Sequence, residues 1–199
     1  MYLNVHSYFS LRYGTLAVDD IVKRAWEWGI KSLALTDINT TTGIFDFAKA
    51  AQKYNIQPLA GIEFRNGDRL LYIGLARNLE GFKELNEFLS RHLLEKTDLP
   101  AKAPVFKHAF IIYPFSGNLP PELKDHEFAG VMPGELSKLY TSSYGKPNNK
   151  TVILHPVTFA DDKGYLLHQH LRAIDHNLLL SQLKPEQMAS PRETMKPLD

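Results

Sequence analysis

Cysteine is absent from this chain of 199 residues. Disulfide bonds and zinc sites built on thiolates are therefore excluded, and the absence favours a cytosolic setting. An excess of either charge is also missing, because 23 lysines and arginines face 22 aspartates and glutamates. The composition gives no support to a large nucleic-acid-binding face, and it leaves contact with nucleic acid through a neighbouring domain open.

Long apolar runs are missing as well. No stretch approaches the roughly 18 apolar residues that a membrane-spanning helix needs, so no membrane partner is expected. The first residues contain no basic segment followed by an apolar one. We therefore expect no secretory signal and a cytoplasmic protein.

Short apolar strands alternate along the chain with amphipathic helices, which is typical of an α/β fold. Strands are predicted at residues 2–6, 32–36, 57–64, 69–76, 108–115 and 151–157. Helices are predicted at residues 18–29, 43–55, 78–94 and 162–183, the last with a break near Asn177. The strands are continuously apolar, which favours a parallel sheet covered by helices, either as a barrel or as an open sheet.

Two stretches are harder to interpret. Residues 116–150 are compatible with short helices at 120–130 and 133–143. Residues 185–199 are polar, contain three prolines and show no element that would pack. We therefore expect one domain over residues 1–184, followed by a polar linker over residues 185–199.

Polar side chains stand where several of the predicted strands end. The first strand carries Asn4 and His6, the second reaches Asp37, the third reaches Glu63, and the last carries His155. In parallel α/β folds, ligands bind at the C-terminal ends of the strands. An imidazole and two carboxylates at one rim are able to bind a single divalent ion, so this rim is the candidate site.

Several blocks of sequence, taken in order, resemble a known family. The blocks are NVHSYFSLRYGT (4–15), SLALTDINTTTGIFDF (32–47), QPLAGIEF (57–64), LYIGLARNLEGFKELNEFLS (71–90) and LHQHLRAIDHNLLLSQL (167–183). They are similar to the PHP (polymerase and histidinol phosphatase) domain, in the version at the N-terminus of bacterial DNA polymerase III alpha subunits. The resemblance implies a distorted seven-stranded β/α barrel. Active members bind up to three metal ions and hydrolyse phosphoesters, which in some polymerases gives proofreading.

When the family's metal-ligand positions are matched to this chain, only a few of them hold a residue that can bind a metal. His6 and Glu63 match ligand positions, His155 is a weaker candidate as a displaced ligand, and Asp37 matches a residue that orients its loop. The positions that have lost a ligand are Asn4, Tyr13, Ile38, Leu71, Phe115, Pro156 and Thr158. None of the apolar side chains among them can replace imidazole or carboxylate on a divalent ion. The resemblance therefore implies a degenerate metal site, with Asn4 left in a supporting role.

Three functional hypotheses follow from the resemblance. The first is a PHP domain without catalysis or cofactor, which acts as a structural platform for a downstream polymerase domain. That domain would contact DNA directly, and other replisome subunits are further candidate partners. No Asp-x-Asp pair occurs in the chain, so the carboxylates for nucleotidyl transfer would lie downstream. The second is a residual phosphoesterase or 3′-5′ exonuclease with one Zn, Mn or Mg ion on His6 and Glu63. The third is a stand-alone module that binds phosphate or protein.

Overall fold

The computed structural model describes residues 1–117, 119–142, 144 and 150–197 as a mixed α/β fold. The strands are β1 (Ser32–Leu35), β2 (Gln57–Asn66), β3 (Arg69–Ala76), β4 (Ala109–Pro114), β5 (Glu127–Val131) and β6 (Thr151–Ile153). The α-helices are α1 (Val18–Glu27), α2 (Ile44–Lys53), α3 (Leu79–Glu95), α4 (Leu136–Thr141) and α5 (Asp162–His176). Short 3-10 turns lie at Pro133–Glu135, Leu180–Gln182 and Pro185–Gln187. Within the described residues no helix combines the length and the apolar character needed to cross a bilayer.

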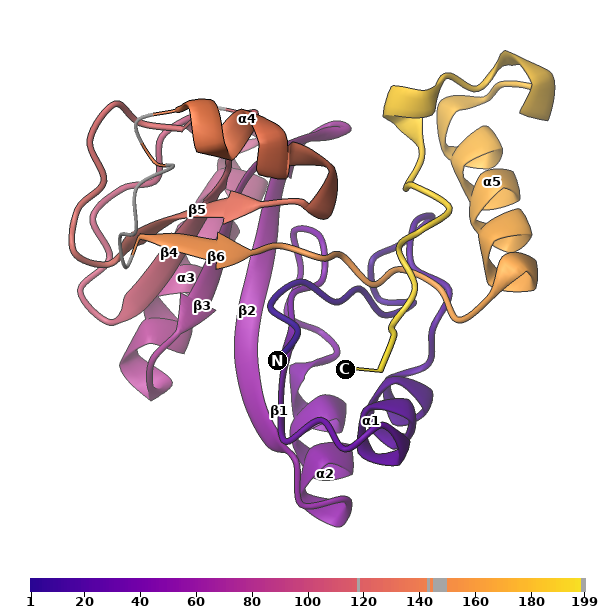
Figure 1. Ribbon diagram of the computed structural model, residues 1–199, viewed down its shortest axis with the longest axis horizontal. Coiled ribbons are helices and arrows are strands. Elements are labelled where there is room, and N and C mark those ends of the chain that lie inside the picture. Colours follow the sequence, from indigo (N-terminus) through magenta and orange to yellow (C-terminus); the bar gives the residue numbers. More distant parts are fainter. Residues whose placement is uncertain (118, 143, 145–149, 198–199) are drawn as a thin grey trace.

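The six strands form one curled sheet in the order of the chain, from β1 to β6 (Figure 1). The sheet is mixed rather than parallel, because β3 runs antiparallel to both β2 and β4. The reversal comes from the two-residue turn at Gly67 and Asp68, where Gly67 has a φ of +56°. An Asn-Gly pair between two apolar runs is a hairpin signal, and Asn66-Gly67 is such a pair. The expected parallel arrangement is therefore wrong at β3.

The predicted strand at residues 2–6 is not regular. Tyr2 pairs with Leu33 of β1, whereas Val5 pairs with Val157, beyond β6. The segment therefore touches both ends of the curled sheet without forming a continuous ladder with either. The Val5 amide donates a hydrogen bond to the Thr36 hydroxyl at 3.0 Å, where a regular strand would donate to a backbone carbonyl of its neighbour. Six named strands are present among the described residues, so the expected count of seven is not confirmed.

Helices cover the sheet through apolar faces with helical spacing. In α1, Val18, Ile21, Val22 and Ala25 are buried, and they pack with α2 and β1 in one cluster. Leu85 and Leu89 of α3 pack in a second cluster against β2, β3 and β4. Figure 1 shows α5 on the opposite side of the N-terminal segment from β4, β5 and β6. The helix ends with Asn177 in the left-handed conformation, at the expected break.

The region from 116 to 150 differs from its predicted structure in one part. The stretch 120–130 contains strand β5 instead of a helix, because Phe128, Ala129 and Gly130 pair between β4 and β6. The stretch from Pro133 forms the 3-10 turn and α4, as predicted, although residue 143 at its end lies outside the described residues.

Residues 185–197, called here the C-terminal strap, pack onto the domain although the sequence suggested no packing element. Ala189 and Met195 are buried. Thr194 pairs with Phe159, and the Tyr2 hydroxyl bonds the backbone of Lys196 in both directions, at 2.8 and 2.9 Å. The strap thus brings the two ends of the chain together (Figure 1). A domain boundary near residue 184 stays a prediction.

Candidate functional site

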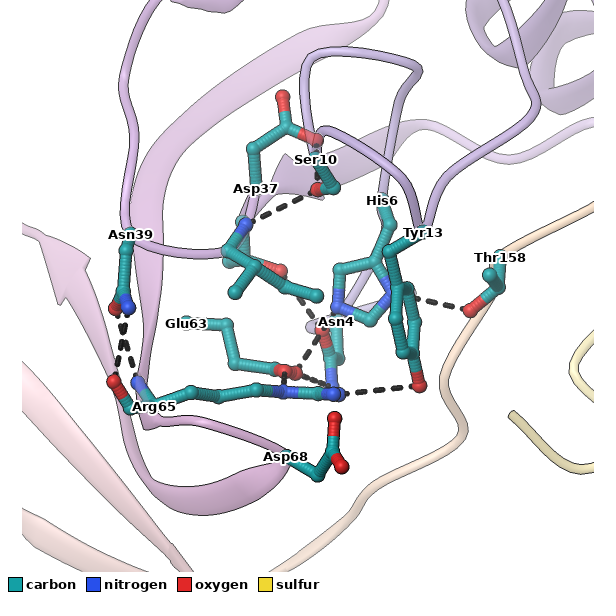
Figure 2. A network of polar contacts seen from close by, with 12 residues as sticks. Asn4, His6, Ser10, Tyr13, Asp37, Asn39, Glu63, Arg65, Asp68 and Thr158 are labelled. Atoms are coloured by element: carbon teal, nitrogen blue, oxygen red, sulfur yellow. Dashed lines mark hydrogen bonds and ion pairs between the residues drawn. The ribbon is translucent and has the colours of Figure 1, made fainter. Parts of the chain in front are cut away.

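The loop after the first segment is held by one buried carboxylate. Asp37, directly after β1, accepts hydrogen bonds from the Ser7 amide at 2.6 Å and the Ser7 hydroxyl at 2.7 Å. It also accepts one from the Ser10 hydroxyl at 2.7 Å. Ser10 in turn accepts the Ile38 amide at 3.0 Å (Figure 2). These bonds fix the path of residues 7–14 above the end of the sheet, and they leave Asp37 pointing away from Glu63.

Glu63 of β2 lies at the centre of the site and is fully buried (Figure 2). Its Oε2 accepts hydrogen bonds from Asn4 Nδ2 at 2.7 Å and from His6 Nε2 at 3.0 Å. Its Oε1 is paired with the guanidinium of Arg65, two residues further along the same strand. Both carboxylate oxygens are therefore already occupied by side chains of the protein.

The charge of Glu63 is stabilised from within the protein. Burial by itself would raise the pKa of this carboxyl group. The charge of Arg65, with His6 and the Asn4 hydrogen bond, outweighs burial and lowers the pKa to about 2. Burial likewise acts to lower the pKa of Arg65, and the nearby Glu63 overcomes it and raises that pKa. The pair is ionised at every physiological pH.

Two further residues fix the position of Arg65. Asn39 holds its backbone through a pair of bonds, with the Arg65 amide donating at 2.9 Å and Asn39 Nδ2 donating to the Arg65 carbonyl at 2.8 Å. The guanidinium lies over the Tyr13 ring, 4.4 Å from its centroid, and Nη2 donates to the Tyr13 hydroxyl at 3.2 Å. Burial raises the pKa of Tyr13 to about 12, so this side chain stays a neutral phenol.

His6 connects Glu63 to the C-terminal strap. Its Nδ1 lies 3.0 Å from the Thr158 hydroxyl oxygen, and that hydroxyl donates to Oε2 of Glu193 in the strap at 2.6 Å. Because the Thr158 proton is directed to Glu193, its oxygen is left to accept from Nδ1. Both ring nitrogens of His6 therefore face an acceptor.

A small cavity lies above the Glu63–Arg65 pair, with a volume of about 160 Å³. Its lining includes Asn4, Tyr13, Leu70 and Pro156, together with Glu186, Gln187, Met188 and Glu193 of the strap. The strap therefore forms one wall of the site. Its carboxylates are residues that sequence reasoning assigned to a linker and missed.

The remaining predicted residues lie in different places. Leu71 is the extra residue at the irregularity between β2 and β3, and it packs in the cluster under α3, so that Leu70 faces the cavity instead. Ile38 packs with the Tyr13–Phe159 cluster. Phe115 packs near Tyr144, its ring centroid 6.5 Å away.

His155 does not join the Glu63 group. Its Nε2 lies 3.0 Å from the Thr194 carbonyl oxygen, and its ring contacts Tyr2 at 5.7 Å. The structure therefore brings together Asn4, His6, Tyr13, Glu63, Pro156 and Thr158, and it leaves His155, Leu71 and Phe115 outside. Arg65 was not predicted at all. The signal was present, because residues two apart on a strand share a face and the sequence reads Glu-Phe-Arg.

The residues present do not fit a divalent ion. Among the described residues no group of three or more histidines, aspartates or glutamates is placed to bind a metal. At Glu63 a cation would have to displace Arg65 from one oxygen and compete with Asn4 and His6 for the other. The guanidinium already supplies the positive charge that a metal would bring.

Comparison with known proteins gives the family. A model of the PHP domain matches residues 3–116 of the chain. The chain is 35% identical over 88 residues to the DNA polymerase III subunit alpha of Ureaplasma parvum, which covers 44% of this chain and 9% of that protein. It is 34% identical over 90 residues to an error-prone DNA polymerase of Symbiobacterium thermophilum, which covers 45% of this chain and 8% of that protein. The chain thus spans less than a tenth of the length of these curated relatives.

Among solved structures, a proposed metal-dependent phosphoesterase from Bifidobacterium adolescentis superposes with a TM-score of 0.38 and 22% identity. The superposition covers 47% of this chain and 32% of that one. A score this low describes a local likeness only.

Proposed function

The chain belongs to the PHP domain family, and on that premise we propose that it is the PHP domain of a DNA polymerase III alpha-type protein that has lost metal-dependent catalysis. Its role is that of a structural platform. One observation carries the proposal: the buried carboxylate Glu63 is neutralised by Arg65 and saturated by Asn4 and His6. Hydrolysis by this family requires a metal-activated water, and a metal at Glu63 would have to compete with these contacts for both oxygens.

The rest of the proposal concerns the context of the domain. Residues 2–6 take the place of a seventh strand, since they pair with β1 on one side and with Val157 on the other. Residues 185–199 lead toward a downstream polymerase domain, through which the protein meets DNA and other replisome subunits in the cytoplasm. The support is the similarity to two DNA polymerase III alpha subunits and an error-prone DNA polymerase, of each of which the matched region covers less than a tenth.

The metal content of the purified protein tests the loss of catalysis. The chain is purified without chelator, incubated with Zn²⁺, Mn²⁺ or Mg²⁺, desalted and analysed for bound metal, alongside His6→Ala and His155→Ala. We expect far less than one ion per chain in all three proteins, and no hydrolysis of a phosphodiester substrate. Stoichiometric metal that disappears in His6→Ala and persists in His155→Ala would favour the residual one-metal phosphoesterase and overturn the platform.

A further inference from the structure

Polar contacts from Gln187 to Lys196 bind the C-terminal strap to the domain. The Gln187 carbonyl accepts Arg172 Nε at 2.7 Å, and the Ala189 amide donates to His168 Nε2 at 2.8 Å. Glu193 accepts the Thr158 hydroxyl at 2.6 Å. The Lys196 backbone bonds to Tyr2, as described above. Two of these contacts, at Ala189 and Glu193, end on residues that also belong to the Glu63 site.

Those two contacts are the ends of one continuous chain of interactions. Because the Ala189 amide donates to Nε2 of His168, the ring proton lies on Nδ1 and is donated to the Tyr13 carbonyl at 2.7 Å. The Tyr13 hydroxyl accepts from Arg65, which pairs with Glu63.

From Glu63 the chain continues through His6 and Thr158 and arrives at Glu193. Six residues therefore connect one point of the strap to another: His168, Tyr13, Arg65, Glu63, His6 and Thr158. Tyr13 contributes its backbone carbonyl toward His168 and its hydroxyl toward Arg65. Figure 2 shows the central part of this path, from Tyr13 to Thr158. His6, Glu63, Thr158 and His168 are fully buried, so their bonds are not exchanged for bonds to water.

From this geometry we propose that the former catalytic site now serves as an intramolecular binding site for the strap. The strap docks as one unit with the buried network, and loss of the network at Glu63 releases residues 188–195. The proposal goes beyond the loss of catalysis, since it concerns what the remaining polar residues do. It also gives a reason for their retention: a buried polar network that lacks one member leaves the others unpaired.

The alternative is that the strap is held by contacts that bypass the network. These are its apolar side chains and its direct hydrogen bonds: the Glu193 carbonyl accepts from the Thr158 amide at 2.9 Å, and the Thr194 carbonyl lies 3.0 Å from His155 Nε2. Ala189 packs with Tyr13 and Phe159, and Met195 packs in the cluster of α1, α2 and β1. If these contacts suffice, a change at Glu63 will not reach the strap. No hydrogen bond joins Glu63 to residues 185–197 in the described structure, so an effect on the strap must travel through the network.

Hydrogen–deuterium exchange of the full chain, read by mass spectrometry, tests the proposal. The variants are Glu63→Gln, which removes the charge without changing the size, and Thr158→Val, which removes the hydroxyl between His6 and Glu193. We expect peptides covering residues 188–195 to exchange at least tenfold faster in both variants. The peptides of α3 and β4 should exchange as in the unchanged protein, because they lie in a separate apolar cluster.

Glu127→Gln is the matched control, since Glu127 is a buried carboxylate that bonds the Lys124 amide and lies outside the network. It should leave exchange in the strap unchanged. Strap exchange unaltered in Glu63→Gln would overturn the proposal, because the apolar contacts and the direct hydrogen bonds of the strap would then hold it without the network. A uniform acceleration over the strap, α3 and β4 would overturn it too, since it would mean general destabilisation rather than release of one segment.

Discussion

At the scale of single residues, the positive charge beside the Glu63 carboxylate belongs to the Arg65 guanidinium and not to a metal ion. Arg65 is covalently part of the chain and needs no uptake from solution. A buried ion pair adds little stability compared with apolar residues of the same shape. Removing only one of its partners, however, strongly lowers the free energy of unfolding, because the other charge stays buried without a counter-charge. Glu63 and Arg65 should therefore be strongly coupled, and each should tolerate replacement of its partner poorly.

Replacing Arg65 by methionine tests this coupling. Arg65→Met leaves the Glu63 carboxylate buried and short of its main counter-charge, so we expect a loss of about 3–5 kcal/mol in the free energy of unfolding. The double variant Glu63→Gln/Arg65→Met should recover much of that loss, because neither position then holds a buried, unpaired charge. Urea unfolding of both proteins, followed by circular dichroism, gives the two values.

Arg12→Met is the control for this measurement. Arg12 is 61% exposed and pairs with Asp175 at 3.1 Å, so its replacement should cost less than about 1 kcal/mol. Equal losses for Arg12→Met and Arg65→Met, or a double variant less stable than Arg65→Met, would contradict the account of the buried pair.

At the scale of the element, the two long helices beside the site begin in the same way. Asn78 accepts the Gly81 amide at 2.9 Å at the start of α3, and Asp161 accepts the Gly164 amide at 2.9 Å at the start of α5. The side-chain oxygen thereby satisfies one of the free amides of the first turn. At Gly81 the small residue is also required by packing, because a Cβ there would lie 2.0 Å from the His108 carbonyl oxygen.

Two substitutions at α3 separate capping from packing. Asn78→Ala should lower the free energy of unfolding by about 1 kcal/mol, the usual value for a lost N-cap. Gly81→Ala should cost more, although alanine is the better helix former, because the β4 entry must move to make room. Thermal and urea unfolding of both variants provide the comparison. A Gly81→Ala protein as stable as the unchanged one would show that the backbone at His108 can move away from the new Cβ without a loss of folding free energy.

At the scale of the whole molecule, the buried site should make stability depend on pH in two separate windows. Burial lowers the pKa of His168 from 6.5 to about 4, and the charged surroundings of Glu63 lower its pKa from 4.5 to about 2. In both cases the unfolded chain takes up the proton first as the pH falls. The native state therefore loses stability between pH 6.5 and about 4 through His168, and between pH 4.5 and about 2 through Glu63.

The upper window is accessible to measurement. We expect the free energy of unfolding to fall between pH 7 and pH 5, with a slope from His168 of at most about 1.4 kcal/mol per pH unit. In His168→Gln this slope should be reduced, because glutamine takes up no proton. Urea unfolding at intervals of half a pH unit, on both proteins, measures the difference. Identical slopes for the two proteins would show that His168 does not carry the upper window.

Much of this molecule follows from the sequence alone. The helices α1, α2, α3 and α5, and most strands, could be predicted because periodicity and caps are local properties. The family resemblance is confirmed. The loss of ligands at Asn4, Tyr13 and Ile38, inferred from the order of the residues, stays a prediction. The hairpin at Gly67 also had a local signal, the Asn-Gly pair, which reasoning from apolar runs alone passed over.

Only the tertiary structure decided which side chains surround Glu63. Arg65 reaches Glu63 in a fixed position because the fold places Asn39 against its backbone and the Tyr13 ring against its guanidinium. Glu193 reaches Thr158 across 35 positions of the chain, and Ala189 reaches His168 across 21. A polar segment such as the strap carries no periodic apolar pattern, so its packing depends on partners that only the folded chain brings near. The sequence determined that the chain belongs to the PHP family, and the fold decided that Arg65 pairs with Glu63 and that the strap lines the same cavity.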